Sequence, residues 1–410
     1  WIAGGNKPDF RTINRFRLDM KNVIEDVFYE VIKLLIEKNY IKLQNYFLDG
    51  TKIEANANKY TFVWNKSVQN YDKKLDEKIK NHLREIDRVV AEENRIYLDE
   101  DLEELGENNR ITSEQVEAVV ESIDARLAET PDNKELKKKA KEFKKDILPR
   151  KKKYEEALHT FEGRNSYSKT DHDATFMRMK EDAMLNGQLK PGYNVQIGTE
   201  NRYIVGYTIH PNPTDTKTMI PHLNHLKEKL GTLPENIITD SGYGSEENYE
   251  YLEENHLGSY VKYNKFHWEK KKKNRENPYL IENMPYDAGT DSFICKNEKR
   301  LIHKGNRKYV TEAGYETSRD YYTCEDCRGC PYASECKNTE KNRTVQVSHR
   351  LNELKRKANE NLCSEKGLQL RAQRVVEVEQ TFGRIKGCWS FRRFHLRGKD
   401  KVKIEWGLLA

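Results

Sequence analysis

The sequence predicts an α/β protein with a mixed sheet, flanking helices, a helical (coiled-coil-like) insertion and a Cys-rich insertion. Three observations lead to this fold class. Residues 189–263 alternate strand-like and helix-like patterns, which is typical of a layered α/β plan. Residues 70–160 are dense in charge but carry apolar residues at helical spacing. Residues 264–345 are basic and turn-rich and hold five of the seven cysteines.

The first segment, residues 1–45, predicts helices. The stretch "NVIEDVFYEVIKLLIEKNYI" has apolar residues at helical spacing and follows the basic, aromatic "FRTINRFR". A short apolar run then reaches Asp49 and a Gly-Thr turn. Because the chain starts at Trp1 and stops within an apolar run, we expect both ends to be clipped.

Residues 70–160 predict two or three helices that pack on one another along apolar seams. Thr112 and Gln115 resemble a capping box that opens the second helix. The surrounding Lys and Glu residues are most simply a solvated face. The seam residues recur every three or four positions and are Leu75, Ile79, Leu83, Ile86, Val90, Val116, Val120, Ile123, Leu127, Leu136, Ala140, Phe143 and Ile147.

The core sheet is predicted between residues 189 and 263. "GYNVQIGTE" and "RYIVGYTIH" alternate in polarity around a polar turn, which favours a β-hairpin. "PTDTKTMIPHLNHLKEKLG" predicts a helix that stops at a glycine. The strand "NIITD", the helix "SEENYEYLEENH" and the strand "SYVKY" follow. Residues 364–390 predict a helix that returns to the core.

The charge distribution favours a polyanionic partner. The net charge is +6, with 34% charged and 36% hydrophobic residues. From residue 341 onward there are 17 Lys/Arg against 7 Asp/Glu, a surplus of +10, so the first 340 residues sum to −4. A basic end of this kind suits nucleic acid, although it is also compatible with a merely soluble surface. No run approaches the roughly 18 apolar residues of a membrane helix, and no signal peptide is visible.

Two acids stand out because each ends a short apolar run and is followed by small residues. They are Asp49 in "FLDGT" and Asp240 in "IITDSGYGS". Strand ends are where ligands collect in such sheets. A carboxylate there is costly without a positive partner, and a hard cation such as Mg²⁺ would supply one. The alternative is that each aspartate caps a turn or the next helix.

A third acid is expected on the last helix. At about 100° per residue, a single core-facing stripe contains Val375, Val378, Phe382 and Ile385. Glu379 lies at the edge of this stripe, with Lys386 nearly in line two turns later, whereas Glu377 is predicted to face solvent. Glu379 can therefore look into a site at the sheet edge. An ordinary contact of Glu379 with water or Lys386 is the alternative.

Four stretches in this order resemble a DDE transposase of bacterial insertion sequences: "FLDGTKIEANANKY", "TDHDATFMRMKEDAMLNGQLKPGYNVQI", "ITDSGYGSEENY" and "RVVEVEQTFGRIKG". The resemblance is closest to the group with a cysteine-bearing insert before the last acid, and it covers nearly the whole chain. It implies a ribonuclease-H-like core. The implied segments are the end of an N-terminal helical domain (1–45), the catalytic core (46–63 and 161–263), a helical insertion (64–160), a Cys-rich basic insertion (264–345) and the C-terminal part of the core with the Glu helix (346–410).

The resemblance implies that Asp49, Asp240 and Glu379 are the catalytic triad and hold two Mg²⁺ (or Mn²⁺) ions. The implied activity is metal-dependent DNA cleavage at transposon ends, followed by strand transfer into target DNA. Related transposases carry an Arg four residues before the Glu and a Lys seven residues after it. Lys386 fits, but Val375 stands at the Arg position, so the Arg role falls to Arg374 or Arg371.

DNA contacts are also predicted after the Glu helix. In "WSFRRFHLRGK", Trp389, Arg392, Arg393 and Arg397 form an aromatic and basic strip that could stack on bases and pair with phosphates. The alternative is a strand with its Phe residues inward and its Arg residues outward. Lys386 is expected to contact phosphate near the terminal bases, as the resemblance implies.

Two other functions stay open on sequence alone. One is a ribonuclease-H-like nuclease that cuts without joining, and the other is an inactive or domesticated DNA-binding protein. The predicted partner is DNA, at transposon ends and target sites, without a membrane. We also predict a cytoplasmic, nucleoid-associated bacterial protein, and a homodimer would suit the pairing of two DNA ends.

The cysteine cluster predicts a metal. Its four members, spaced C-x2-C-x2-C-x5-C, are Cys324, Cys327, Cys330 and Cys336. Thiolates at this spacing can hold a structural Zn²⁺, whereas an iron–sulfur cluster or no metal are the alternatives. Cys295 could replace one member. The insert looks too polar to hold itself together, so a structural metal would stabilise it, and the tight cluster favours a reducing cytoplasm.

Overall fold

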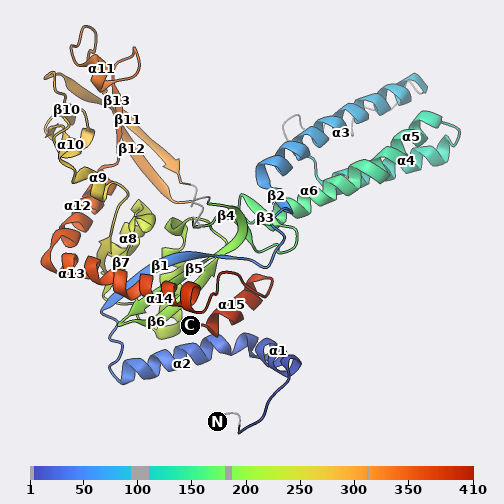
Figure 1. Ribbon diagram of the computed structural model, residues 1–410. Coiled ribbons are helices and arrows are strands. Elements are labelled where there is room, and N and C mark those ends of the chain that lie inside the picture. Colours follow the sequence, from blue (N-terminus) through green and yellow to red (C-terminus); the bar gives the residue numbers. More distant parts are fainter. Residues whose placement is uncertain (1–3, 94–109, 181–186, 312–313) are drawn as a thin grey trace. The chain divides into compact units, whose positions relative to one another are not determined.

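The computed structural model of the chain describes residues 4–93, 110–180, 187–311 and 314–410 (Figure 1). It divides into two compact units. The first comprises residues 1–53, 194–394 and 400–410, and the second residues 54–193 and 395–399. Parts of the segments predicted above, residues 1–3, 94–109, 181–186 and 312–313, lie outside the described residues.

A mixed sheet forms the centre of the first unit. Its strands are β1 (Asn45–Glu54), β5 (Leu189–Glu200, in this unit from Asn194 on), β6 (Tyr203–His210), β7 (Asn236–Thr239) and β8 (Gly258–Val261). Their order is β6, β5, β1, β7, β8. β1 and β8 both pair parallel with β7, whereas β5 and β6 form the antiparallel hairpin expected from their alternation. Every residue of β7 is buried, as a central parallel strand requires. The predicted α/β plan with a mixed sheet is confirmed.

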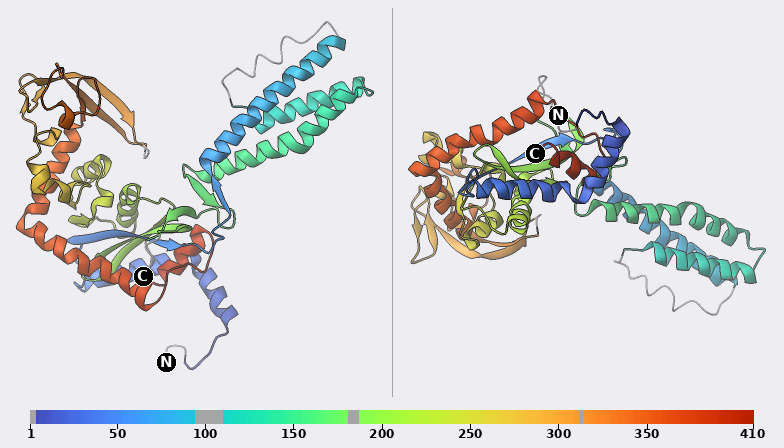
Figure 2. Two further views of the ribbon diagram at one scale, coloured as in Figure 1. Left: turned by 45° about the horizontal axis from the view of Figure 1, so that its top comes forward. Right: turned by 90° about the horizontal axis from the view of Figure 1, so that it is seen from below.

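Helices flank this sheet. They are α1 (Phe10–Asp19), α2 (Ile24–Glu37), α7 (Met219–Leu230), α8 (Glu246–Glu254), α12 (His349–Cys363), α13 (Glu365–Arg374), α14 (Gln380–Gly383) and α15 (Lys399–Gly407). α2 and α7 pack on β6, α8 and α12 on β8, and α13 on β7. The C-terminal helices α12 to α14 follow one another along the sheet (Figure 2).

A buried glutamate secures the entry of the chain into β1. Glu200, at the end of β5, accepts hydrogen bonds from four consecutive backbone N–H groups, those of Lys42, Leu43, Gln44 and Asn45, at 2.6–3.2 Å. Hydrogen bonds to a charged group are worth more than neutral ones. Glu200 therefore holds the loop that leads directly to the strand of Asp49.

Replacing Glu200 with Ala is expected to lower the free energy of unfolding by about 3 kcal/mol, because four N–H donors, one buried and three partly buried, lose their acceptor. Urea unfolding of the purified variant measures this. As a matched control, Glu254→Ala, at the end of α8, should change stability by no more than about 0.5 kcal/mol. A Glu200→Ala protein as stable as the parent would contradict the anchoring role.

The second unit is mainly helical. Its elements are β2 (Phe62–Trp64), α3 (Asn65–Glu93), α4 (Ser113–Glu129), α5 (Lys134–Glu142), α6 (Leu148–Phe161), β3 (Ser166–Ser168) and β4 (Thr175–Arg178). The predicted seam residues form one buried cluster, with Leu127 partly buried; the side chain of Val90 lies outside the description. Both bonds of the Thr112–Gln115 capping box are present. Lys151 is fully buried and pairs with Asp72 and Asp76 at 2.8 and 2.5 Å.

The Cys-rich segment forms a sheet of its own within the first unit. Its strands, in the order β13-β12-β11-β10-β9, are β9 (Tyr286–Asp287), β10 (Ser292–Ile294), β11 (Arg300–Val310), β12 (Glu316–Cys324) and β13 (Thr344–Val347). Short helices α9 (Phe266–Glu269), α10 (Lys272–Arg275) and α11 (Ala333–Cys336) accompany them. Met284, Phe293, Leu301, Tyr322, Cys324, Cys327 and Val347 form a separate buried core. This segment, which we expect a metal to stabilise, therefore also has a small buried core, and that core includes two of the predicted ligands, Cys324 and Cys327.

Candidate active site

Two acids lie near the same edge of the sheet, just past the paired parts of β1 and β7. These parallel strands pair over only three residues each, ending at Phe47 and Ile238. Asp240 directly follows β7, but β1 continues beyond Asp49 to Glu54, so the expected strand end at Asp49 is wrong. Each carboxylate accepts one local backbone N–H at 2.8 Å, from Gly50 and from Gly242. Asp240 therefore also caps the short turn Ser241–Tyr243, as the alternative reading of the sequence allowed, whereas Asp49 lies within β1.

The helix of Glu379 contains two wide, π-helical turns that change where its side chains point. They span Val375–Glu379 and Arg384–Cys388. Such turns are rare in helices and frequent at functional sites. From Val378 onward the predicted stripe is confirmed, because Val378, Phe382 and Ile385 are buried. Val375, however, is 53% exposed, so its assignment to the core stripe is wrong.

Two glutamates of this turn, Glu377 and Glu379, have different surroundings. Glu377 was predicted to face solvent but is buried, and it accepts a hydrogen bond from the backbone N–H of Arg202 at 2.7 Å. Glu379 keeps a half-exposed side chain. The prediction for Glu377 fails because an α-helical wheel assumes about 100° for every residue, whereas a π turn contains an extra residue and so rotates by less per residue.

Arg374 joins the three predicted acids. Its guanidinium lies 2.8 Å from Asp49 Oδ2, 3.8 Å from Asp240 Oδ2 and 3.8 Å from Glu379 Oε1. The side chain of Arg374 is only 10% exposed, and its Nε atom is buried without a hydrogen-bond partner. Residues 49, 240 and 379, which come from a strand, a loop and a helix, are thus brought around one guanidinium. Arg374 itself, predicted to contact DNA, lies buried among the acids.

Burial is the largest influence on the electrostatics of the site, and charged neighbours modify it. Burial raises the pKa of Asp49 to about 6; the Arg374 guanidinium opposes this rise, and the Asp240 and Asp215 carboxylates add to it. Lys262, which follows β8, has a lowered pKa because it is partly buried and near Arg374 and Arg371. One guanidinium therefore compensates several carboxylates incompletely.

Asp215 is a fourth acid that the sequence reasoning missed. It begins the short 3₁₀ turn Asp215–Lys217 before α7, and its Oδ1 accepts hydrogen bonds from Asn194 at 2.7 Å and Gln196 at 2.9 Å. A Cβ at Gly50 would lie 2.3 Å from this Oδ1, so only glycine after Asp49 admits the carboxylate. In the sequence "NPTDTKT", Asp215 resembles an ordinary residue at the start of a helix. Its place in the site becomes clear only from its hydrogen bonds to strand β5.

The donor chemistry of the site fits a divalent cation. Carboxylate oxygens from Asp49, Asp240 and Glu379 are the hard ligands that Mg²⁺ and Mn²⁺ prefer. In the structure these oxygens are arranged around Arg374. Within residues 4–93, 110–180, 187–311 and 314–410, no three His, Cys, Asp or Glu side chains are grouped closely enough to hold a metal ion. Cation binding would require the carboxylates to turn from the guanidinium toward a common ion.

Residues 294–410 match the family model described as "Transposase DDE domain". The resemblance to DDE transposases is confirmed. The matched part contains Arg374, Glu379 and Lys386 but neither Asp49 nor Asp240. Searches of curated proteins and of solved structures found no match. In the described part of the chain, no helix has the length and apolar character needed to cross a membrane.

The basic residues predicted to contact DNA lie at several places. Lys386 donates from Nζ to Thr51 Oγ1 at 2.5 Å and to the Lys52 carbonyl at 3.0 Å, so it contacts β1 just beyond Asp49. The guanidinium of Arg371 stacks on Phe266 at 5.3 Å. In the second unit, Arg397 Nε donates to the Asn56 carbonyl at 2.7 Å.

The aromatic and basic strip after the Glu helix agrees in part with the alternative prediction, a strand with its Phe residues inward and its Arg residues outward. Phe391 and Phe394 are buried and contact Trp406, whereas Arg392 and Arg393 are exposed, although the segment forms no extended strand. Trp389 is half exposed. An exposed indole and two exposed guanidinium groups are compatible with the predicted DNA contacts, which stay a prediction.

The four clustered cysteines are not gathered around one point. Burial, with a neighbouring Cys327 thiol, raises the pKa of Cys324 to about 12, which favours the neutral thiol. Cys336 Sγ accepts a hydrogen bond from the Arg343 guanidinium at 2.8 Å. Among the described residues no thiol group is arranged as a metal site, so a zinc ion would require these side chains to move.

Zinc at the cysteine cluster stays a prediction with a simple check. We expect elemental analysis of the folded protein to find about one zinc per chain, held by thiolates. A Cys324→Ser/Cys327→Ser protein should lose that zinc, whereas a Cys388→Ser protein, changed at an exposed cysteine, should retain it. Folded protein containing neither zinc nor iron would refute the metal.

Proposed function

We propose that this protein is a DNA transposase that cleaves DNA at transposon ends and joins the freed end to target DNA in a ribonuclease-H-like core. The observation that carries this proposal is the meeting of Asp49, Asp240 and Glu379 around Arg374. The match to the transposase DDE domain supports the same function. DNA is the substrate that such a domain implies.

Asp49, Asp240 and Glu379 would hold the metal. Two divalent cations supply an activated oxygen nucleophile, charge relief on the phosphate and a stabilised leaving oxygen. The excess negative charge around Asp49 supports cation binding, since a buried carboxylate is costly without compensation. Asp49 supplies the most buried carboxylate and Glu379 the most exposed, so Glu379 has the most freedom to adjust.

Other residues would position the DNA strand. Lys386 lies beside β1 within the reach of a phosphate that approaches Asp49, and Lys262 adds positive charge from the end of β8. Gly242 and Gly244 leave little side-chain bulk beside Asp240, which admits a phosphate backbone. Trp389, Arg392 and Arg393 offer stacking and ionic contacts to the end of the DNA. Arg374 holds the acids together until the cations bind.

A strand-transfer assay tests the proposed function. Labelled duplexes taken from the DNA that flanks the coding sequence serve as transposon ends, and a supercoiled plasmid serves as target, with Mg²⁺ or Mn²⁺ present. Joined product is expected. Nicked DNA without joined product would indicate a nuclease, and a mobility shift without any cleavage would indicate a DNA-binding protein. Scattering at increasing concentration would show whether the predicted homodimer forms.

A further inference from the structure

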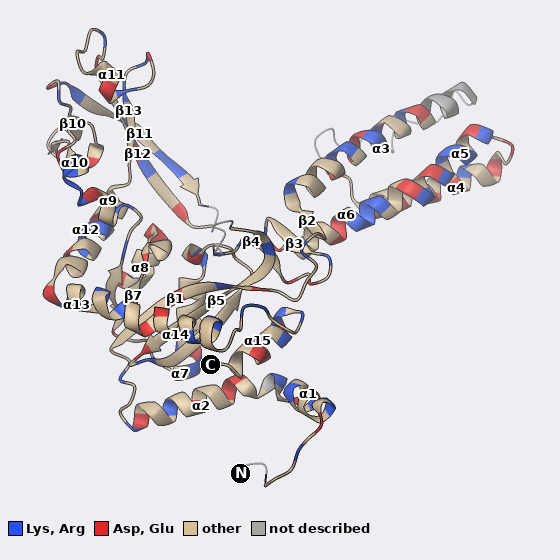
Figure 3. Cartoon of the chain, viewed as in Figure 1, with Lys and Arg blue, Asp and Glu red and all other residues tan. Residues whose placement is uncertain are grey.

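The long hairpin of β11 and β12 carries an unusual set of side chains on one of its faces. Arg307 in β11 lies directly opposite Arg319 in β12. Like charges directly opposite each other in a sheet destabilise the pairing. Figure 3 draws Lys and Arg in blue, and blue segments lie along the hairpin labelled β11 and β12. We therefore expect another group to offset the repulsion between these two arginines.

Two tyrosines hold the arginines in place. The Arg307 guanidinium stacks on Tyr321 at 4.9 Å, and that of Arg319 stacks on Tyr309 at 4.5 Å. Arg319 also donates to Gln346 Oε1 of β13 at 3.1 Å. Because Gly305 pairs with Tyr321 and Thr317 with Tyr309, all four residues belong to one face of the hairpin. We call them the Tyr–Arg ladder: Tyr309, Arg307, Arg319 and Tyr321.

The ladder is accessible and its charge is unbalanced. Arg307 and Arg319 are exposed, and neither forms an ion pair with a carboxylate of the described residues. The two acids of β12, Glu316 and Asp320, alternate with the ladder residues and so belong to the opposite face, where Asp320 contacts His303 and Asn306 at 3.0 Å. Stacked guanidinium groups are pre-organised for bidentate pairing with phosphate, and tyrosine rings accept stacked bases.

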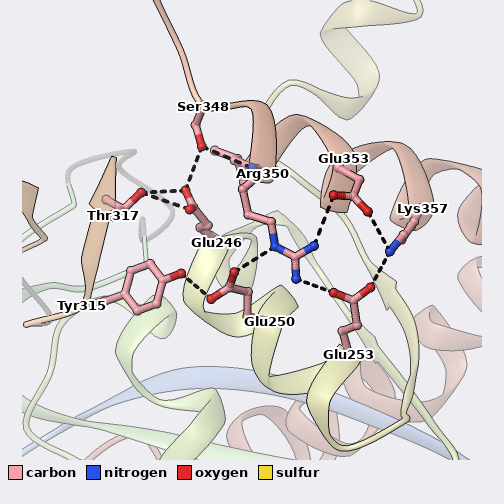
Figure 4. A network of polar contacts seen from close by, with 10 residues as sticks. Glu246, Glu250, Glu253, Tyr315, Thr317, Ser348, Arg350, Glu353 and Lys357 are labelled. Atoms are coloured by element: carbon pink, nitrogen blue, oxygen red, sulfur yellow. Dashed lines mark hydrogen bonds and ion pairs between the residues drawn. The ribbon is translucent and has the colours of Figure 1, made fainter. Parts of the chain in front are cut away.

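A polar network connects the hairpin to helices α8 and α12 of the same unit (Figure 4). Thr317, the register partner of Tyr309, donates to both carboxylate oxygens of Glu246 at 3.0 Å, and Tyr315 donates to Glu250. Arg350 of α12 pairs with Glu250 at 2.9 Å. Glu246 and Glu250 belong to α8, the helix that begins shortly after Asp240. The ladder is thus held to the element that follows a predicted catalytic acid.

We propose that the Tyr–Arg ladder is a DNA-binding surface that grips the phosphate backbone of duplex DNA beside the active site. The choice of DNA as ligand rests on the proposed function. Two arginines facing each other without a protein carboxylate, each supported by an aromatic ring, fit a polyanion better than an acidic peptide segment. The surface supplies affinity rather than sequence specificity, because it contacts phosphates.

The test uses the full chain with Arg307→Gln and Arg319→Gln together. Binding to a fluorescein-labelled DNA duplex of arbitrary sequence is measured by anisotropy between about 0.05 M and about 0.2 M salt. Loss of two phosphate contacts should reduce the slope of log affinity against log salt by about 1.8 and weaken binding at least about tenfold at 0.1 M salt. Arg328→Gln is the matched control, since Arg328 is exposed in the same segment but pairs with Asp326 at 3.0 Å.

A second variant separates ionic from stacking contributions. Tyr321→Leu keeps both charges, so it should weaken DNA binding with an unchanged salt slope. Thermal unfolding of each variant identifies any protein that fails to fold. If the folded double variant keeps the parent salt slope while the parent joins DNA, the ladder proposal is wrong and the transposase proposal stands. A parent protein that binds no duplex DNA, or that prefers single-stranded RNA, overturns both.

Discussion

Replacing Asp240 with Asn is expected to reduce strand transfer at least about a thousandfold, because metal ions held by the three proposed catalytic acids would stabilise the transition state by several kcal/mol. Asp240 lies 3.8 Å from the Arg374 guanidinium that also contacts Asp49 and Glu379, so its carboxylate belongs to the group that would share the cations. DNA affinity should change little, since affinity comes mainly from basic residues that contact phosphates. A gel assay of joined product and anisotropy on the same preparation measure both quantities.

The control for this variant is Glu360→Gln. Glu360 is an exposed acid of α12 paired with Arg356, and its loss should leave strand transfer unchanged. Asp49→Asn and Glu379→Gln should resemble Asp240→Asn. Retained cleavage or joining in the folded Asp240→Asn protein would refute the assignment of the site.

Replacing Arg374 with Gln is expected to lower the free energy of unfolding of the metal-free protein by about 3 kcal/mol, since removing one partner of a buried ion pair leaves an uncompensated charge. Asp49 and Arg374 are both mostly buried and lie 2.8 Å apart. Mg²⁺ or Mn²⁺ should restore much of this loss, because the cation then replaces the guanidinium. Urea unfolding with and without the cation measures the effect.

The loss caused by Arg374→Gln should depend on pH in a defined direction. In the folded protein the pKa of Asp49 is raised to about 6, mainly by burial, compared with about 3.9 in an unfolded chain. The folded state therefore binds more protons between these values, and this group's contribution to stability is lost as pH rises through about 6. Without Arg374, which lowers the Asp49 pKa, the loss becomes larger and extends to higher pH.

The pH dependence gives this prediction its control. The stability difference between the parent and Arg374→Gln should be greater at about pH 8 than at about pH 4. Arg371→Gln, one helical turn away on Phe266, should show neither the pH-dependent loss nor the rescue by cations. A stability difference that is equal at both pH values would contradict the pairing of Arg374 with the acids.

Local sequence patterns were sufficient to predict the sheet and two of its acids. Strand periodicity identified the β5–β6 hairpin and the buried β7, and the position of Asp240 after β7 followed from the end of its apolar run. The seams of the helical segment were equally readable, because helices packed on one another repeat their apolar residues at a fixed spacing.

The remaining features depend on partners far away in the chain. Two π turns change the direction in which side chains leave the helix. A regular α-helical wheel therefore gave the wrong burial for Val375 and Glu377, although it correctly directed Glu379 toward the acids. In the sequence, Arg374 resembles a surface arginine. In the structure it is surrounded by acids from β1 and from the loop after β7. Asp215 owes its orientation to Asn194 and Gln196 on β5, which no local pattern reveals.

The Cys-rich segment illustrates a different limit. Its composition is polar overall, which led to the expectation that a structural metal would stabilise it. A few apolar side chains spread over its strands, including Phe293, Leu301 and Tyr322, nevertheless meet in a small core. Average polarity hides this, because strand pairing brings together residues that are distant in sequence.

The central claim is that Asp49, Asp240 and Glu379 share divalent cations, and a crystal structure of the protein soaked with Mn²⁺ tests it most directly through the anomalous signal of manganese. The predicted result is manganese coordinated by oxygens of these three residues at about 2.0–2.3 Å, with the Arg374 guanidinium displaced from them. Manganese bound elsewhere, or absent while the three carboxylates still contact Arg374, would contradict the claim.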